Sequence, residues 1–88
     1  MKFQLRIDIY PSSGSNKTRK IEITEYFNAR DMDSAVDIAV GIAGDATRLT
    51  NSHYYDFRGY DSRAFLFSFN DFGMIDRYVW HSDIVRLR

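Results

Sequence analysis

The chain has 88 residues, with 12 basic and 12 acidic side chains and no cysteine. This length fits one domain over residues 1–88. The lack of cysteine excludes disulfides, thiolate metal sites and a cysteine nucleophile. A net charge of zero provides no overall field that attracts DNA or an anionic membrane. Ten aspartates against two glutamates, and nine arginines against three lysines, favour turns, helix caps and interfaces.

The first residues alternate between polar and apolar side chains from the start, which is not the pattern of a signal peptide. The longest apolar stretches are far shorter than a membrane span. We therefore expect a soluble, cytoplasmic protein that has no membrane partner.

Two strands are predicted at the start of the chain. Every second residue is apolar in residues 2–10, and residues 18–27 resume this alternation. Residues 11–17 lie between them and are rich in turn-forming side chains, so the two strands form a hairpin.

Two registers of this hairpin keep the apolar faces together. We expect the register that pairs Asp8 with Lys20 and Arg6 with Glu22, because it places opposite charges across the outer face. The other register places Asp8 opposite Glu22, a like-charge pair. In the expected register Glu25 falls on the inner side, close to the open end of the hairpin and within reach of water.

Helical spacing follows the hairpin. Asp31 is a suitable N-cap, and apolar residues recur at helical intervals over residues 32–49. The apolar arc covers about 200°, more than a one-sided helix needs, so we expect Ile38 and Val40 to be partly exposed. We expect one helix over these residues; alternatively, Gly44-Asp45 breaks the helix and caps a short last turn.

The last third of the chain predicts further strands over residues 53–58, 64–69 and 74–80, with a short terminal strand over residues 84–87. Residues 70–73 form a hairpin turn in which Gly73 supplies a positive φ. Pairing across this turn sets Phe69, Phe67 and Phe65 near Met74, Asp76 and Tyr78. The expected fold is α+β, with a single helix on an antiparallel sheet of four to five strands in the order ββαβββ.

Signals for catalysis and metal binding are weak. No serine lies in a nucleophile elbow, and no glycine-rich loop of the phosphate-binding kind occurs. The histidines and nearby aspartates match no metal-ligand spacing, and surface histidines explain them equally well. We therefore expect no enzyme, no metal and no cofactor. The candidates considered for a metal are His53, Asp56, Asp61, His81 and Asp83.

The segment Arg63-Ala64-Phe65-Leu66-Phe67-Ser68-Phe69 is similar to the Arg-Gly-Phe-Gly-Phe core of an RNA-recognition sheet, whose aromatic residues stack on bases. Its arginine and first two phenylalanines match, and its leucine and serine do not. This resemblance implies a single-stranded nucleic-acid-binding domain. The simpler interpretation is that the phenylalanines pack against the helix as core, and the zero net charge also disfavours the resemblance. The residues of this alternative site are Phe65, Phe67, Tyr78 and Arg77.

Protein recognition is the leading interpretation. Residues 53–63 concentrate tyrosine and arginine, which are enriched at binding hot spots. The polar face of the helix is acidic and suits a basic partner surface, although a solvated face explains it too. The residues expected to bind protein are Tyr54, Tyr55, Arg58, Tyr60, Arg63, Asp33 and Asp37.

Residues 21–39 combine a strand with the pattern Ala-x-Asp-x-Asp-x-Ala. This pattern starts at Ala29 and opens an amphipathic helix. This layout resembles small phage-encoded strand–helix–strand proteins, among them anti-CRISPR proteins and inhibitors of host RNA polymerase. The resemblance implies a non-enzymatic inhibitor, acting in the host cytoplasm, that binds a host nucleic-acid-handling complex stoichiometrically. It carries no binding residues across. A homodimer or other homo-oligomer, held by the broad helix arc, is the remaining alternative.

Overall fold

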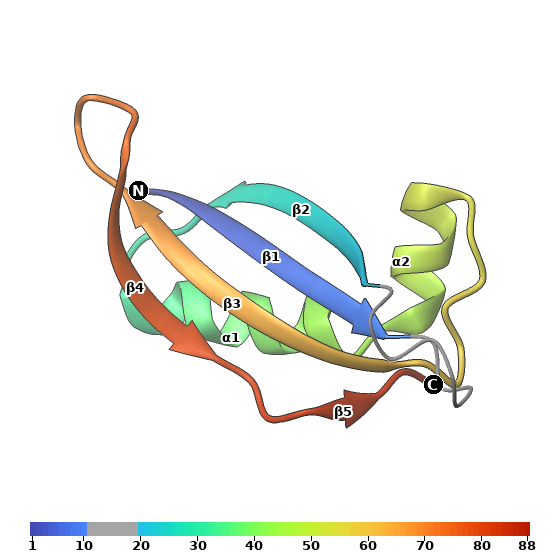
Figure 1. Cartoon of the computed structure of the whole chain (residues 1–88). Helices are drawn as coiled ribbons and strands as arrows, with labels where there is room; N and C mark the ends of the chain where they lie inside the picture. Colours follow the sequence, from blue (N-terminus) through green and yellow to red (C-terminus); the bar gives the residue numbers. More distant parts are fainter. Residues whose placement is uncertain (11–19) are drawn as a thin grey trace.

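The chain forms one sheet with two helices in a computed structural model, which describes residues 1–10 and 20–88 (Figure 1). The strands pair in the order β2-β1-β3-β4, and β5 also pairs with β3; every pairing is antiparallel. The turn predicted over residues 11–17 and the predicted strand residues 18–19 lie outside the described residues. The elements are β1 (Lys2–Tyr10), β2 (Ile21–Asn28), α1 (Met32–Ala43), α2 (Ala46–His53), β3 (Asp61–Phe69), β4 (Ile75–His81) and β5 (Val85–Arg86).

The fold is therefore α+β with an antiparallel sheet of five strands, as expected, but with two helices instead of one. None of the described helices is long and apolar enough to cross a membrane.

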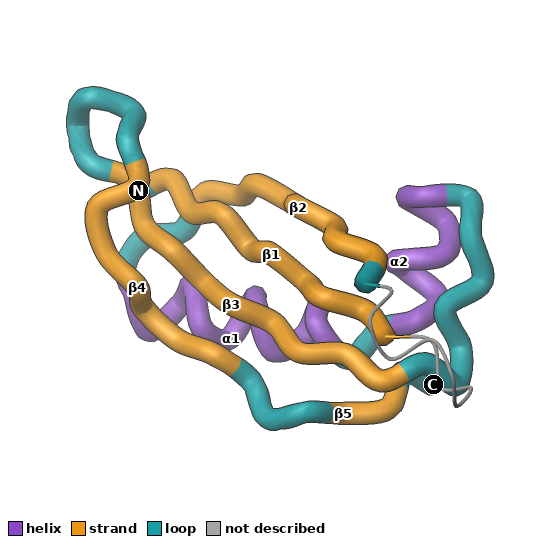
Figure 2. The backbone as a smooth tube through the Cα atoms, viewed as in Figure 1, coloured by secondary structure: helices purple, strands orange, loops and turns teal. Residues whose placement is uncertain are grey.

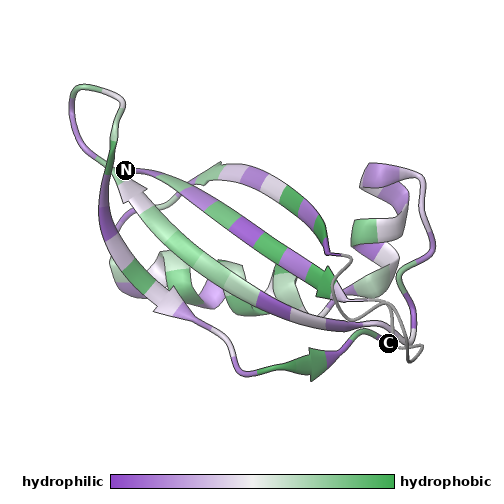
Figure 3. Ribbon diagram, in the orientation of Figure 1, coloured by the Kyte–Doolittle hydropathy of each residue, from purple (hydrophilic) through white to green (hydrophobic). Residues whose placement is uncertain are grey.

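One face of the sheet packs on α1 and forms the core (Figure 2). The alternation predicted for the first strand is visible along β1 in Figure 3, and its apolar row is fully buried. α1 faces this row mainly with alanines. The buried residues on this face are Phe3, Leu5, Ile7 and Ile9 of β1, Ser62, Ala64, Leu66 and Ser68 of β3, and Ala35, Ala39, Ile42 and Ala43 of α1.

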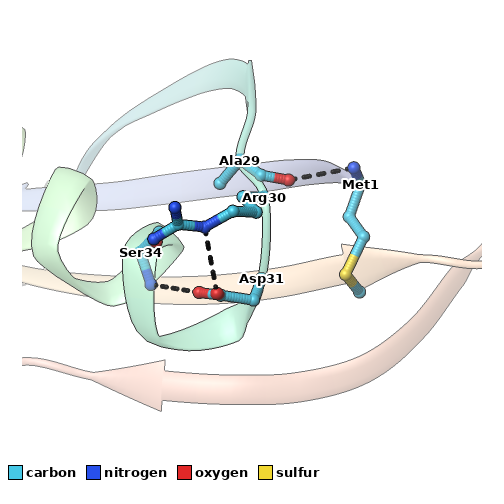
Figure 4. A network of polar contacts seen from close by, with 5 residues as sticks. All are labelled: Met1, Ala29, Arg30, Asp31 and Ser34. Carbon is cyan, nitrogen blue, oxygen red and sulfur yellow. Dashed lines mark hydrogen bonds and ion pairs between the residues drawn. The ribbon is translucent and has the colours of Figure 1, made fainter.

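α1 begins where the sequence predicts. The Asp31 Oδ1 atom accepts a hydrogen bond from the backbone N–H of Ser34 at 2.8 Å, which satisfies a free donor of the first turn (Figure 4). This hydrogen bond lowers the pKa of Asp31 below its usual value, and Arg30, 3.4 Å away, lowers it further. Next to the cap, Ala29 and Met1 exchange backbone hydrogen bonds of 2.9 Å, which tie the end of β2 to the start of β1.

The single helix expected over residues 32–49 is wrong, and the alternative break at Gly44-Asp45 is what the structure contains. Gly44 ends α1, and Asp45 caps α2 through a 3.0 Å bond from the N–H of Arg48 to its Oδ1 atom. The second helix buries Ala46 and Leu49 in the core. The strand predicted over residues 53–58 is also wrong, because α2 extends to His53 and a turn follows it.

The register of the first hairpin is the one that the charge rule disfavoured. Asp8 lies opposite Glu22, and Arg6 lies opposite Thr24. Lys20 compensates for the like charges, because its Nζ atom lies 3.6 Å from Asp8 Oδ2 and 3.9 Å from Glu22 Oε2. The Nε atom of Arg6 lies 3.5 Å from the other Asp8 oxygen. A bridging cation thus replaces the direct pairs that were expected.

The β3–β4 hairpin has the predicted turn, with Gly73 at φ 77°. Its pairing is shifted by two register irregularities, so Phe69 pairs with Ile75, Phe67 with Tyr78, and Phe65 with His81. The predicted pairs Phe69–Met74 and Phe67–Asp76 are therefore wrong.

The observed hairpin register can be checked by the sign of two stability changes. Glu22→Gln removes a like charge opposite Asp8 and should leave the free energy of unfolding unchanged or raise it by a few tenths of a kcal/mol. Lys20→Gln removes the bridging cation and should lower it by about 1 kcal/mol. Urea unfolding measures both. A clear loss of stability in Glu22→Gln would instead indicate that Glu22 faces Arg6.

Candidate functional site

The phenylalanines of β3 lie on the face of the sheet opposite α1. Phe65 pairs with Arg6 and Phe67 pairs with Gln4, both from the polar row of β1. Within residues 1–10 and 20–88 no helix lies over this face (Figure 2). The expectation that the phenylalanines pack against the helix is therefore wrong; the smaller row of β3 faces the helix instead.

Basic side chains lie over these aromatic rings. The Cζ atom of Arg6 is 4.6 Å from the ring centre of Phe65, and that of Arg63 is 5.4 Å from the same ring. The Nζ atom of Lys2 is 5.1 Å from the ring centre of Phe69 and 5.3 Å from that of Tyr26. These distances fit cation–π contacts. We call this surface the cation–aromatic face; its residues are Lys2, Arg6, Tyr26, Arg63, Phe65, Phe67, Phe69, Tyr78 and His81.

Tyr78 connects the aromatic row of β3 to β4. Its ring centre lies 5.5 Å from that of Phe67 in an edge-to-face arrangement and 6.5 Å from that of Phe65. About half of the Tyr78 side chain is exposed. Three of the four residues predicted for a nucleic-acid site therefore meet. The fourth, Arg77, pairs with Ser68 of the helix-facing row and lies apart from them.

Two arginines of this face approach Phe65. Arg6 lies opposite it on β1, with its Nε atom in an ion pair with Asp8, and Arg63 precedes it by two residues on β3, with a buried Nε–H that has no hydrogen-bond partner among the described residues. Arg63 also lies 3.4 Å from His81 Nδ1 through its Nη2 atom. The buried Asp8 lies on the same face, where it pairs in register with Arg63 and lies 3.5 Å from Arg6 Nε, so it compensates part of this positive charge.

The residues predicted to bind protein occupy three separate places. Arg63 belongs to the cation–aromatic face. Asp33 and Asp37 are exposed on α1, on the other side of the sheet. The others lie in the loop between α2 and β3, residues 54–60, which we call the tyrosine loop. Its members are Tyr54, Tyr55, Arg58 and Tyr60.

The tyrosine loop is ordered by contacts among its own side chains. Phe57 is buried, and the ring of Tyr55 lies 5.1 Å from it. The hydroxyls of Tyr55 and Tyr60 are 3.3 Å apart, a hydrogen bond that raises the pKa of Tyr60. Arg58 donates to both oxygens of Asp56 at 3.0 Å, which lowers the pKa of that carboxyl to about 2.

Tyr54 differs from its neighbours. It is 95% exposed and adopts a left-handed conformation with φ 55° at the end of α2. A tyrosine in this conformation costs conformational energy that glycine avoids. No described contact of its side chain offsets that cost.

One cluster was not predicted from the sequence. Glu25 lies on the helix side of β2, with its side chain 13% exposed, and contacts two residues of α2. Its Oε2 atom is 3.6 Å from Arg48 Nη2, and its Oε1 atom is 3.7 Å from His53 Nε2. The signal in the sequence was the position of Glu25, which is two residues from both Ile23 and Phe27 and so shares the apolar row of its strand. This cluster holds α2 against the edge strand β2.

The remaining expectations concern self-association and metals. Ile38 and Val40 are 38% and 55% exposed, so their predicted exposure is confirmed. Nowhere in residues 1–10 and 20–88 do three or more histidine or carboxylate side chains gather as a metal site requires. His53 faces Glu25 and His81 lies beside Arg63, so the two histidines are parts of different clusters.

No family model, curated protein or solved structure matches the chain. Function is therefore inferred from the geometry of the described residues alone.

The strain at Tyr54 predicts a gain in stability on substitution. Tyr54→Gly should raise the free energy of unfolding by about 1 kcal/mol, because glycine adopts the left-handed conformation without a steric cost. Tyr54→Ala is the matched control, because it removes the ring and keeps the Cβ atom. Urea unfolding of both variants separates the two effects. Equal stability of the glycine and alanine variants would contradict backbone strain at this position.

Proposed function

We propose that the chain binds single-stranded nucleic acid on the cation–aromatic face. The observation that carries this proposal is the position of Phe65, Phe67 and Phe69 on the side of the sheet that neither described helix covers, in contact with basic side chains. Stacked aromatic rings beside cations are the combination that single-strand-binding sheets use.

The aromatic groups supply stacking positions for bases. Tyr26 and Tyr78 are 57% and 51% exposed, and they flank the phenylalanine row on the β2 and β4 sides. A base stacked on such a ring contributes about 1–3 kcal/mol and requires no particular sequence. Rings that stack on bases suit a single strand, whose bases are accessible, better than a duplex.

The cations supply contacts for phosphates. Arg6 and Arg63 present planar guanidinium groups that bind phosphate through two hydrogen bonds. Lys2 adds a third charge at the far end of the phenylalanine row. With three cations, the slope of log affinity against log salt should be about −2 for a single strand. Charges elsewhere on the chain are screened at physiological salt, so Asp8, 3.5 Å from Arg6, is the carboxylate that a phosphate competes with on this face.

Binding of a fluorescent oligo(dT) of about 15 nucleotides tests this function. We expect Tyr78→Ala to weaken binding about tenfold through the lost stacking, and Arg63→Gln to weaken it and reduce the salt slope by about 0.7. Fluorescence anisotropy over a salt series measures both quantities.

Arg77→Gln is the matched control, because Arg77 is an exposed arginine that pairs with the helix-facing row. It should leave affinity and slope unchanged. An absence of binding at low salt, or an Arg77→Gln effect as large as that of Arg63→Gln, would contradict the proposal.

A second candidate function is protein binding by the tyrosine loop. The observation that favours it is the exposed, strained Tyr54, since tyrosine and arginine dominate binding hot spots and strain is retained where a side chain is used. In this function the chain acts as a stoichiometric inhibitor that occupies a surface of a host nucleic-acid-handling complex. The exposed Arg58 of the same loop adds a second hot-spot residue type.

A pull-down from nuclease-treated bacterial lysate tests this second function. The double variant Tyr54→Ala, Arg58→Ala should lose a stoichiometric protein partner, because it removes both exposed hot-spot side chains. Tyr78→Ala, on the cation–aromatic face, should retain that partner. Retention of the partner by the double variant would exclude the tyrosine loop as the docking surface.

A further inference from the structure

The turn between β3 and β4 carries an exposed apolar tip. Phe72 is 87% exposed, Met74 65% and Ile75 50%. Figures 1 and 2 show this turn projecting beyond the rest of the sheet. We call residues 70–76 the hairpin tip.

Hydrogen bonds fix the conformation of the hairpin tip. The Oδ1 atom of Asn70 accepts from the N–H of Phe72 at 2.9 Å and from that of Met74 at 3.1 Å. The backbone N–H of Asn70 donates to Met74 O at 2.9 Å, and that of Gly73 donates to Asn70 O at 3.1 Å. The backbone that carries the Phe72 ring is therefore organised before any ligand arrives, which lowers the entropic cost of binding.

The hairpin tip adjoins the cation–aromatic face at Phe69. Ile75 pairs with Phe69, the last phenylalanine of the row, and the exposed Met74 and Phe72 precede Ile75 in the turn. A strand that lies along β3 and stacks on Phe69 meets the hairpin tip next.

Charge changes sign at this point. Arg63, Arg6 and Lys2 lie along the row up to Phe69. Beyond it, the exposed Asp71 and Asp76 are the charged residues nearest to Phe72 in the chain. Two carboxylates repel a phosphate but tolerate an uncharged base.

We propose that the hairpin tip receives the free end of a single strand, with the terminal base stacked on Phe72. This inference rests on the proposed nucleic-acid-binding function. A strand that continued past the tip would bring further phosphates close to Asp71 and Asp76, whereas a strand that ends there brings only a base and a sugar hydroxyl. The ligand class is therefore a single strand with an unphosphorylated end.

The test compares three forms of one oligo(dT), about 20 nucleotides long and of identical sequence. One form has hydroxyls at both ends, one has phosphates at both ends, and one is a closed circle. At low salt we expect the hydroxyl form to bind about fivefold more tightly than the other two.

Variants of the hairpin tip test whether the Phe72 ring and the two carboxylates cause this preference. Phe72→Ala should bind the hydroxyl form as weakly as the circle, and Phe72→Trp should keep the preference, because either aromatic ring stacks on a base. The double variant Asp71→Asn, Asp76→Asn should bind all three forms about equally, because the carboxylates that repel further phosphates are gone. The matched control is Asp33→Asn, Asp37→Asn on the opposite side of the molecule, which should leave every ratio unchanged. Phe72 is mostly exposed, so its substitution leaves the core intact.

The outcomes separate the two proposals. Equal binding of all three forms would overturn end recognition and leave single-strand binding standing. A Phe72→Ala loss that is the same for linear and circular forms would also overturn it, because the tip would then stack on internal bases. Binding of none of the three forms would overturn the proposed function and, with it, this inference.

Discussion

The contact between the alanines of α1 and the small side chains of β3 determines where the phenylalanines of this chain lie. α1 faces the sheet with Ala35, Ala39 and Ala43, and the helix-facing row of β3 is mostly small, with Ser62, Ala64 and Ser68 beside Leu66. Small side chains on both elements let the helix backbone approach β3 closely at normal packing density, whereas the larger buried side chains of this layer, such as Phe3, come from β1. Because side chains alternate along a strand, a small row inside places the phenylalanine row outside. The cation–aromatic face is thus a consequence of core packing.

Local rules predicted most of the elements. Alternation located β1 and much of β3 and β4, the Asp31 cap located the start of α1, and the glycine turn located the β3–β4 hairpin. The errors arose where two local signals competed or where a third residue took part. At residues 44–45 the helical spacing continued, but Gly44 and the capping residue Asp45 favoured a break. The break lets α2 bury Ala46 and Leu49 in the core. The hairpin register followed a three-residue arrangement around Lys20, which a rule for facing pairs does not include.

The sequence predicted which aromatic residues of the candidate site share a row, but not which face of the sheet that row occupies. Periodicity assigned Phe65, Phe67 and Phe69 to one row, and this assignment is correct. It does not say which row the helix covers, and hydrophobicity alone favours the wrong one. Side-chain volume identifies the covered row, because the alanine stripe of α1 matches only the Ala64–Leu66 side of β3. The basic members Lys2 and Arg6 come from a strand some 60 residues away, and only the pairing of β1 with β3 brings them to the rings.

The zero net charge then constrains how the cation–aromatic face works. Asp33 and Asp37 lie on α1, and Asp8 offsets part of the positive charge on the cation–aromatic face itself, so the chain has no net field that steers a distant ligand. In the free protein each cation rests on an aromatic ring, a contact worth about 0.5–1 kcal/mol at an exposed site. A base that stacks on the same rings contributes about 1–3 kcal/mol, so it can displace the cations. The displaced cations remain tethered beside the phosphates of that base. Stacking and charge are therefore coupled on this face, and short-range stacking rather than long-range attraction decides whether a ligand stays.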